Sequence, residues 1–349
     1  MAKIDVLFKA MLDLDGSDLH LEQGQVPKIR AQGEIREIPG YPVLTQEVIH
    51  DYLEEITPSY QWEQFEKTGD MDFAYDMGES ARFRANLFRH FDGYGGIFRI
   101  IPTKILTLEQ LGAPEVFKSF ADLRSGLVLV TGPTGSGKST TLAAIIDFIN
   151  TNYRKKIITI EDPVEFVHPP KTSLITHREV HAHTNSFTTG LQGAIKSDVD
   201  VILVGEMRDE ETIELALTAV EMGILVFGTL HTNSAAKTID RIIDVFPAKK
   251  KPQIRNILAN SLQAVVSQQL LKSADRKRRW AAHEILLSTS ALPGIIRSGE
   301  TTKLVTLIQM SRGIGMISMD DCLAEMLKDE KIDQGEAFLK AIDKERFKK

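Results

Sequence analysis

The residues with the clearest chemistry lie in the segment VTGPTGSGKSTTL, which runs from Val130 to Leu142. The segment stands between an apolar run and a helical pattern, and it matches the phosphate-loop spacing G-x-x-x-x-G-K-[ST] with Gly132, Gly137, Lys138 and Ser139. Glycines let backbone N–H groups surround a phosphate, where a Cβ would block the approach. The lysine adds positive charge beside the β- and γ-phosphates, and the serine hydroxyl is a ligand for Mg²⁺. A glycine-rich turn that merely opens a helix is the alternative, but the flanking elements favour a site for ATP and Mg²⁺ formed by Gly132, Pro133, Thr134, Gly135, Ser136, Gly137, Lys138, Ser139 and Thr140.

Polar residues also follow three further apolar segments that read as strands. Glu206 ends VDVILVGE, where a carboxylate can orient the water that attacks a γ-phosphate or support the metal; an ordinary polar strand end is the alternative. Glu161 and Asp162 end the strand pattern of ITIEDPVEF, and Glu161 is a candidate Mg²⁺ partner acting through water. His231 ends GTLHT and can sense a γ-phosphate by hydrogen bonding, although a lone histidine is more often structural.

Two other polar groups allow more than one interpretation. Arg82, Arg84 and Arg99 lie in hairpin patterns of the first hundred residues, where arginine either bridges phosphate oxygens or only keeps an exposed strand face soluble. THREVHAHT contains His177, His181 and His183 at spacings that a metal could use, but we favour a polar loop.

The pattern of apolar residues divides the chain into a small α+β domain and an α/β domain. Residues 1–102 alternate short strands with helices and contain no phosphate motif, and residues 103–124 read as a linker entering a short helix. In 125–349, nearly continuous apolar strands alternate with helices, as in a parallel sheet covered on both faces. From about Lys250 the pattern predicts mainly helix, with one last strand in RRWAAHEILL.

Composition narrows the possible partners. The net charge is −6, and the short basic run DRKRR reads as a solvated loop, so nucleic acid is not expected to bind. The single cysteine, Cys322, excludes a four-cysteine zinc site. The N-terminal segment does not read as a signal peptide, and no apolar run reaches the roughly 18 to 20 residues of a membrane span, so we expect any membrane role to act through partners.

The chain resembles the type IV pilus retraction ATPases, a branch of the type II/IV secretion ATPase superfamily, in the segments GPTGSGKSTTLAAIIDF, TIEDPVEFVH, VILVGEMRDEETIELALTA and GTLHTNSAAKTIDRIIDVFP. The likeness extends to GSDLHL, ARFRANLF, IFRIIP, AAHEI and GMISMDDCLAEML, and so to nearly the whole sequence. It implies a PAS-like N-terminal domain, a RecA-like ATPase domain with ATP bound between the two, and a homohexamer. Such a motor is cytoplasmic, lies at the inner face of the bacterial inner membrane, and acts on a membrane platform protein to disassemble pilin in twitching motility.

The resemblance also implies roles for individual residues. Glu206 stands at the catalytic glutamate of Walker B, Glu161 in the family's Asp box, and His231 in its His box. Arg82, Arg84 and Arg99 fall in arginine-bearing strands that act at the ATP site or at a subunit interface.

The sequence departs from the family pattern in three places. Ile224 replaces a histidine before the His-box strand, which predicts a partly missing sensor, and Lys196 replaces an arginine before Walker B. Pro293 and Gly294 interrupt the motif tied to retraction, and we expect them in mid-helix, where they shorten or displace the helix.

These departures keep a second function open, an accessory or regulatory ATP-binding subunit that works with an active paralogous ATPase. A pilus-extension or type II secretion ATPase is disfavoured because its usual zinc insertion needs four cysteines. A helicase or packaging ATPase is disfavoured because the sequence shows no basic or aromatic track for nucleic acid.

Overall fold

The computed structural model describes residues 2–31, 33–78, 81–101 and 104–348. The chain forms two compact units, Met1–Lys104 with Asp162–Val167, and Ile105–Glu161 with His168–Lys349. The domain boundary expected between residues 102 and 103 lies outside the described residues.

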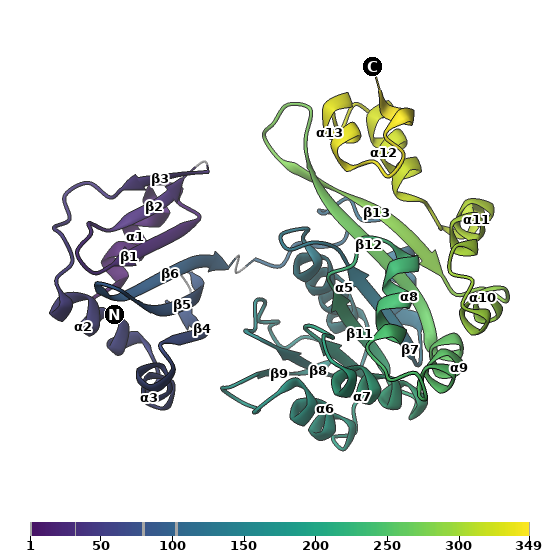
Figure 1. Cartoon of the computed structure of the whole chain (residues 1–349), viewed down its shortest axis with the longest axis horizontal. Helices are drawn as coiled ribbons and strands as arrows, with labels where there is room; N and C mark the ends of the chain where they lie inside the picture. The colour runs from purple at the N-terminus through teal and green to yellow at the C-terminus, as the bar shows by residue number, and fades with distance from the viewer. Residues whose placement is uncertain (1, 32, 79–80, 102–103, 349) are drawn as a thin grey trace. The chain divides into compact units, whose positions relative to one another are not determined.

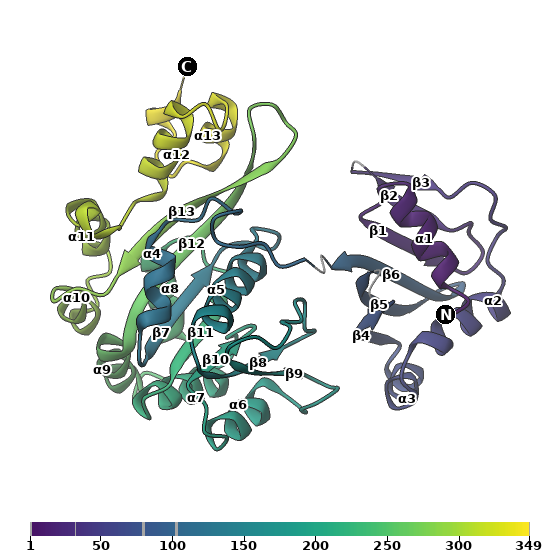
Figure 2. The same ribbon diagram turned by 180° about the vertical axis from the view of Figure 1, so that it is seen from behind.

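The first unit is a six-stranded antiparallel sheet in the order β3-β2-β1-β6-β5-β4, with three helices packed on one face (Figure 2). Alternation along β5 explains this arrangement, because Phe83, Ala85 and Leu87 are buried, while the residues between them, Arg84 and Asn86, face away from the core. The elements are α1 (Asp5–Asp13), β1 (Asp18–Glu22), β2 (Lys28–Ala31), β3 (Glu34–Glu37), α2 (Gln46–Ile56), α3 (Ser59–Thr68), β4 (Asp70–Asp76), β5 (Arg82–His90) and β6 (Gly93–Ile101). This is the small α+β unit that the sequence predicts.

The second unit contains a seven-stranded sheet in the order β13-β12-β7-β11-β10-β8-β9 (Figure 1). All of its strand pairs are parallel except β12 with β13. The strands are β7 (Gly126–Thr131), β8 (Lys156–Glu161), β9 (Leu174–Glu179), β10 (Val201–Val204), β11 (Leu225–Leu230), β12 (Leu262–Lys272) and β13 (Arg279–Leu287). The expected α/β fold with a covered parallel sheet is confirmed.

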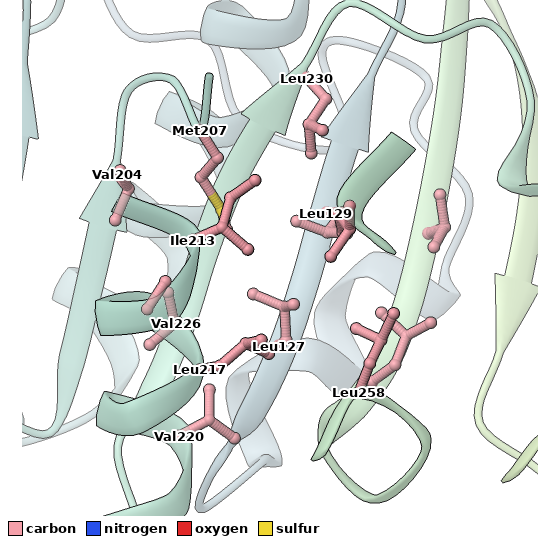
Figure 3. Close-up of a cluster of buried hydrophobic side chains, with 14 of the residues drawn as sticks. Leu127, Leu129, Val204, Met207, Ile213, Leu217, Val220, Val226, Leu230 and Leu258 are labelled. Carbon is pink, nitrogen blue, oxygen red and sulfur yellow. The ribbon is translucent and has the colours of Figure 1, made fainter. Parts of the chain in front are cut away.

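The helices of this unit cover both faces of the sheet. They are α4 (Val116–Ser119), α5 (Lys138–Asn152), α6 (Phe187–Ile195), α7 (Glu210–Glu221), α8 (Ala235–Asp244), α9 (Lys251–Ser261), α10 (Leu292–Ser298), α11 (Lys303–Met310), α12 (Met319–Lys328) and α13 (Gln334–Lys340), with 3₁₀ turns at Phe120–Asp122, Arg312–Ile314 and Glu345–Phe347. Figure 3 shows Leu127 and Leu129 of β7 and Val226 of β11 meeting Ile213 and Leu217 of α7. A separate core on the other face joins α4 and α5 to the same strands.

Strand β12 corrects the expectation of a mainly helical segment after Lys250. Its eleven residues pair in parallel with β7 and antiparallel with β13. Most of its side chains are buried on both faces, so the strand shows no two-residue alternation that would distinguish it from helix. The long-range pairing with β7 determines its conformation.

Pro293 and Gly294 do not lie in mid-helix, so that expectation is wrong. Pro293 occupies the first turn of α10, where its missing N–H is not needed, and Gly294 has open space around it. The helix is short, but Leu292 and Ile296 anchor it in the core.

The other two departures also lie away from the phosphate loop. Ile224 precedes β11, packs in the core and is bonded through its carbonyl to the amide of Gly126, at the amino end of the sheet. His231 follows the other end of the same strand, roughly 20 Å away at about 3.3 Å per residue. Within one chain, the isoleucine at position 224 therefore takes no hydrogen-bonding group away from the carboxyl ends of the strands. Lys196 is exposed and caps the C-terminal end of α6, where its positive charge suits the helix dipole.

Candidate functional site

The phosphate loop connects β7 to α5 and depends on its glycines. Gly132, Gly135 and Gly137 have φ values of 148°, 77° and 85°, which side-chain-bearing residues rarely adopt. A Cβ on Gly132 would lie 2.3 Å from the backbone oxygen of Gln268 and 2.6 Å from Oγ of Ser136. The backbone therefore forms a cradle that tolerates no side chain at Gly132.

The polar groups of the loop fit a phosphate and a Mg²⁺ ion. Lys138 Nζ donates to the carbonyls of Gly132 and Pro133 at 2.9 and 3.2 Å, so its charge lies directly over the loop. The hydroxyl of Ser136 is buried and has no hydrogen-bond partner among the described residues. Ser139 lies in the first turn of α5, half-buried, at the positive end of that helix. Backbone amides, a lysine and hydroxyl groups are the donor set that a triphosphate with Mg²⁺ requires.

The carboxyl ends of the neighbouring parallel strands bring the other predicted groups to the same edge of the sheet. Glu206 follows β10 and His231 follows β11, and His231 Nε2 lies 3.1 Å from Oε1 of Glu206. The same oxygen contacts Arg208. The Glu206 side chain is 18% exposed, so it remains accessible to solvent while it makes these contacts. The structure therefore assembles a carboxylate and an imidazole that the sequence places far apart.

Glu161 reaches this edge at the end of β8. The amide of Gly205 donates to the carbonyl of Ile160 at 2.8 Å, which continues the pairing with β8 one residue past the end of β10. A Cβ on Gly205 would lie 3.1 Å from Cα of Glu161, a tighter contact than most Cβ atoms make, so glycine favours the close approach of the two strand ends. Glu161 and Glu206 thus emerge from adjacent strand ends.

The three arginines lie on the first unit, on the sheet face opposite its helices. Arg84 and Arg99 are direct cross-strand partners, and Arg82 is two residues along β5 on the same face. Arg99 Nε donates to Oδ1 of Asp18 at 2.7 Å, and Arg82 lies 4.0 Å from Asp76. Burial would raise the pKa of Asp18, but hydrogen bonds from Ser17 and Arg99 outweigh it and lower that pKa. The carboxylate offsets the repulsion between the paired arginines.

The histidines of THREVHAHT do not form a metal site. His177 lies on β9 with Nδ1 2.9 Å from the hydroxyl of Thr159, and His183 Nδ1 accepts from the amide of Glu179. His181 is exposed in a left-handed turn with φ of 67°. Among the described residues no cluster of three potential ligands occurs.

The basic run DRKRR joins β12 to β13, and two of its arginines make contacts within the chain. Arg276 pairs with Asp333 at 2.8 Å, and the guanidinium of Arg278 stacks on Trp280 with its carbon 4.2 Å from the ring centroid.

Within the described residues, no helix is both long enough and apolar enough to cross a membrane.

Sequence reasoning missed the polar side chains that lie beneath the loop. Gln268 on β12 contacts the loop carbonyl of Ser136, and Thr141 and His283 contact Gln268. Beside them a cavity of about 270 Å³ is lined by Gly137, Thr140, Leu111, Leu270 and Arg279, among others. The sequence signal is weak, because the polar pair Gln268 and Gln269 only interrupts an apolar run, and the pattern after Lys250 predicts mainly helix.

Burial of His283 predicts a loss of stability in acid. Desolvation lowers the pKa of His283 to about 4, so between about pH 6.5 and 4 the unfolded chain binds a proton that the folded chain does not. The free energy of unfolding should therefore fall as the pH falls through this window, by on the order of 3 kcal/mol from this one group. Urea unfolding at a series of pH values measures the slope. His283→Gln, which cannot titrate, should reduce the slope, and an unchanged slope in that variant would contradict the assignment.

Comparison with known proteins agrees with this geometry. The family model described as type II/IV secretion system protein matches residues 78–311. The type IV pilus retraction ATPase PilT of Pseudomonas aeruginosa is 48% identical over 331 residues, covering 95% of this chain and 96% of that protein. The twitching motility protein of Neisseria gonorrhoeae is also 48% identical, over 86% of this chain and 80% of that protein.

A solved structure agrees over the whole length. A crystal structure of the pilus retraction motor PilT with bound ADP superposes with a TM-score of 0.90 at 38% identity, covering 99% of this chain and 98% of that one. With its phosphate loop and the carboxyl-edge residues Glu161, Glu206 and His231, the chain belongs to the type II/IV secretion system protein family and, within it, to the type IV pilus retraction ATPases.

Proposed function

We propose that this protein is a Mg²⁺-dependent ATPase whose homohexamer powers type IV pilus retraction, the disassembly of pilin that underlies twitching motility. The observation that carries the proposal is the pairing of Glu206 with His231 at the carboxyl ends of the parallel strands, where the phosphate loop also begins. The 48% identity to a retraction ATPase over nearly the full length gives this site its biological role.

Each residue of the site has a defined task in this reaction. The loop amides and Lys138 bind the β- and γ-phosphates, while the apolar wall formed by Leu111 and Leu270 is suited to the base and ribose. Mg²⁺ neutralises charge on the phosphates, and the hydroxyl of Ser139 and, through water, the carboxylate of Glu161 are the groups suited to hold it.

Glu206 orients the water that attacks the γ-phosphate. Both of its contacts among the described residues use Oε1, which leaves Oε2 for that water. His231, bonded to the same carboxylate, can exchange this contact for one to the γ-phosphate and so report whether it is present. Arg82, Arg84 and Arg99 supply positive charge at the ATP site or at a subunit interface.

The wider setting rests on the family alone. We propose that the hexamer works in the cytoplasm against the inner face of the inner membrane, and that it transmits force to the pilus platform protein. No role for nucleic acid is proposed, since Arg276 and Arg278 of the basic run already have partners within the chain.

The accessory-subunit alternative loses its original support. It depended on Ile224 and on Pro293 with Gly294, but the first lies in the core at the amino end of the sheet and the other two fit the first turn of a surface helix. The complete loop and the Glu206–His231 pair favour an active motor, which can still work beside a paralogous ATPase.

The proposal predicts Mg²⁺-dependent ATP turnover by an oligomer. Purified protein should release phosphate from ATP, turnover should stop when EDTA removes Mg²⁺ and return when Mg²⁺ is restored, and light scattering after gel filtration should give the mass of a hexamer. A monomeric protein that binds ATP without releasing phosphate, alone or with Mg²⁺, would sink the autonomous-motor claim.

A further inference from the structure

The side chain of Gln268 lies directly beneath the phosphate loop. It is only 2% exposed, and its Nε2 donates to the carbonyl of Ser136 at 2.7 Å. A Cβ on Gly137 would lie 2.9 Å from this Nε2, and the backbone oxygen of Gln268 abuts Gly132. Gln268 thus forms the floor against which Gly132 and Gly137 of the loop pack.

The partners of Gln268 determine the orientation of its amide. The carbonyl of Ser136 can only accept a hydrogen bond, so the amide nitrogen must face it. The amide oxygen then faces the hydroxyl of Thr141 at 2.8 Å and Nε2 of His283 at 3.1 Å, and both of these must donate. His283 therefore carries its proton on Nε2.

His283 is suited to keep this role permanently. It is buried, its ring meets Phe117 edge-on with centroids 5.2 Å apart, and burial lowers its pKa to about 4, so it stays neutral. Its backbone amide also donates to Sγ of Cys322 on α12, at 3.4 Å. The contact with Phe117 holds the ring and the bond to Cys322 holds the backbone of the same residue, so His283 can hold the glutamine in turn.

The consequence for the loop follows from the planarity of the peptide bond. In a trans peptide the C=O and N–H point in opposite directions. When Gln268 draws the carbonyl of Ser136 toward β12, the N–H of Gly137 is aimed away from β12, toward the side of the loop that takes an anion. Thr141, one turn into α5, is fixed by the same amide.

We propose that Gln268 is a positioning residue that holds the Ser136–Gly137 peptide in its phosphate-binding orientation, and that His283 orients Gln268 for this task. The inference rests on the proposed nucleotide-binding function, and it assigns to AAHEI a role in nucleotide affinity. Neither side chain takes part in the reaction itself, so the pair sets how tightly nucleotide binds and not how fast bound ATP reacts.

The test measures ADP affinity by calorimetry and kcat at saturating ATP and Mg²⁺. Gln268→Met keeps the side-chain volume but removes the hydrogen bonds, and it should weaken ADP binding about 5- to 10-fold while kcat stays within about 2-fold of the wild type. Gln269→Met is the matched control, because the neighbouring residue points to the other face of β12 and should leave the Kd unchanged.

Variants of His283 test whether this residue orients Gln268, and they provide a second test if Gln268→Met does not fold. His283→Leu should weaken ADP binding about 3-fold or more, and His283→Gln, which keeps a neutral N–H donor, should restore the wild-type Kd. If these side chains acted through packing alone, the variants would lose thermal stability, but Kd would not change independently of kcat. His283→Gln would then also fail to restore the wild-type Kd.

The outcomes separate this inference from the proposed function. Wild-type protein that binds ADP, with Gln268→Met binding equally tightly, would overturn the positioning role and leave the ATPase proposal intact. If Gln268→Met does not fold, equal Kd values for His283→Leu and His283→Gln overturn it. Wild-type protein that binds no ADP would overturn both.

Discussion

Replacing Glu206 with glutamine is expected to reduce ATP turnover by about 10² to 10⁴-fold, because a neutral amide is a weaker hydrogen-bond acceptor than a carboxylate and cannot take a proton from the attacking water. Glutamine keeps the length of the side chain, and its amide oxygen can still accept from His231, so the site should stay assembled and ADP should bind with unchanged affinity. Phosphate release at saturating ATP and Mg²⁺, together with calorimetric ADP binding, measures the two quantities.

The matched control is Glu214→Gln. Glu214 makes the same kind of carboxylate contact, an ion pair with Lys250 at 3.0 Å, but it is 47% exposed on α7. Loss of this ion pair should leave ATP turnover within about 2-fold of the wild-type rate, because exposed ion pairs contribute little. If Glu206→Gln turns over ATP as fast as this control, Glu206 is not the group that activates water, and Glu161 becomes the candidate.

Replacing Gly132 with alanine should abolish nucleotide binding at micromolar concentrations. The φ of 148° is strained for alanine, and its Cβ would meet the backbone oxygen of Gln268 at 2.3 Å, where β12 is fixed by pairing on both sides. Relieving this clash must move the loop, and a cost of about 3 kcal/mol corresponds to roughly 100-fold weaker binding. ADP titration followed by calorimetry tests this expectation.

Gly294→Ala provides the control for the same chemical change. Gly294 lies in the first turn of α10 with open space around it, so a methyl group meets nothing there. Alanine is the better helix former, and this variant should bind ADP normally and be equally or slightly more stable. ADP binding by Gly132→Ala that matches Gly294→Ala would show that the loop reaches its phosphate-binding form without the glycine.

The sequence alone determined the ATPase fold and most of the candidate site. The spacing of Gly132, Gly137 and Lys138 requires a strand before it and a helix after it, and β7 and α5 are those elements. Glu161, Glu206 and His231 could be expected together because each follows a strand of one parallel sheet, and parallel strands present their carboxyl ends at one edge. For such residues, the local sequence pattern is sufficient to predict that they lie at the same end of the sheet.

Only the tertiary structure showed which side chain lies beneath the phosphate loop and what effect Ile224 and Pro293 have on the site. Nothing local distinguishes β12 from a buried helix, because its strand form depends on hydrogen bonds to β7, more than a hundred residues earlier, so Gln268 could not be placed under Ser136. Ile224 and Pro293 looked damaging while their positions along their elements were unknown. Their effect depends on which end of a strand or helix they occupy, and that end is defined by pairing and burial between distant segments of the chain.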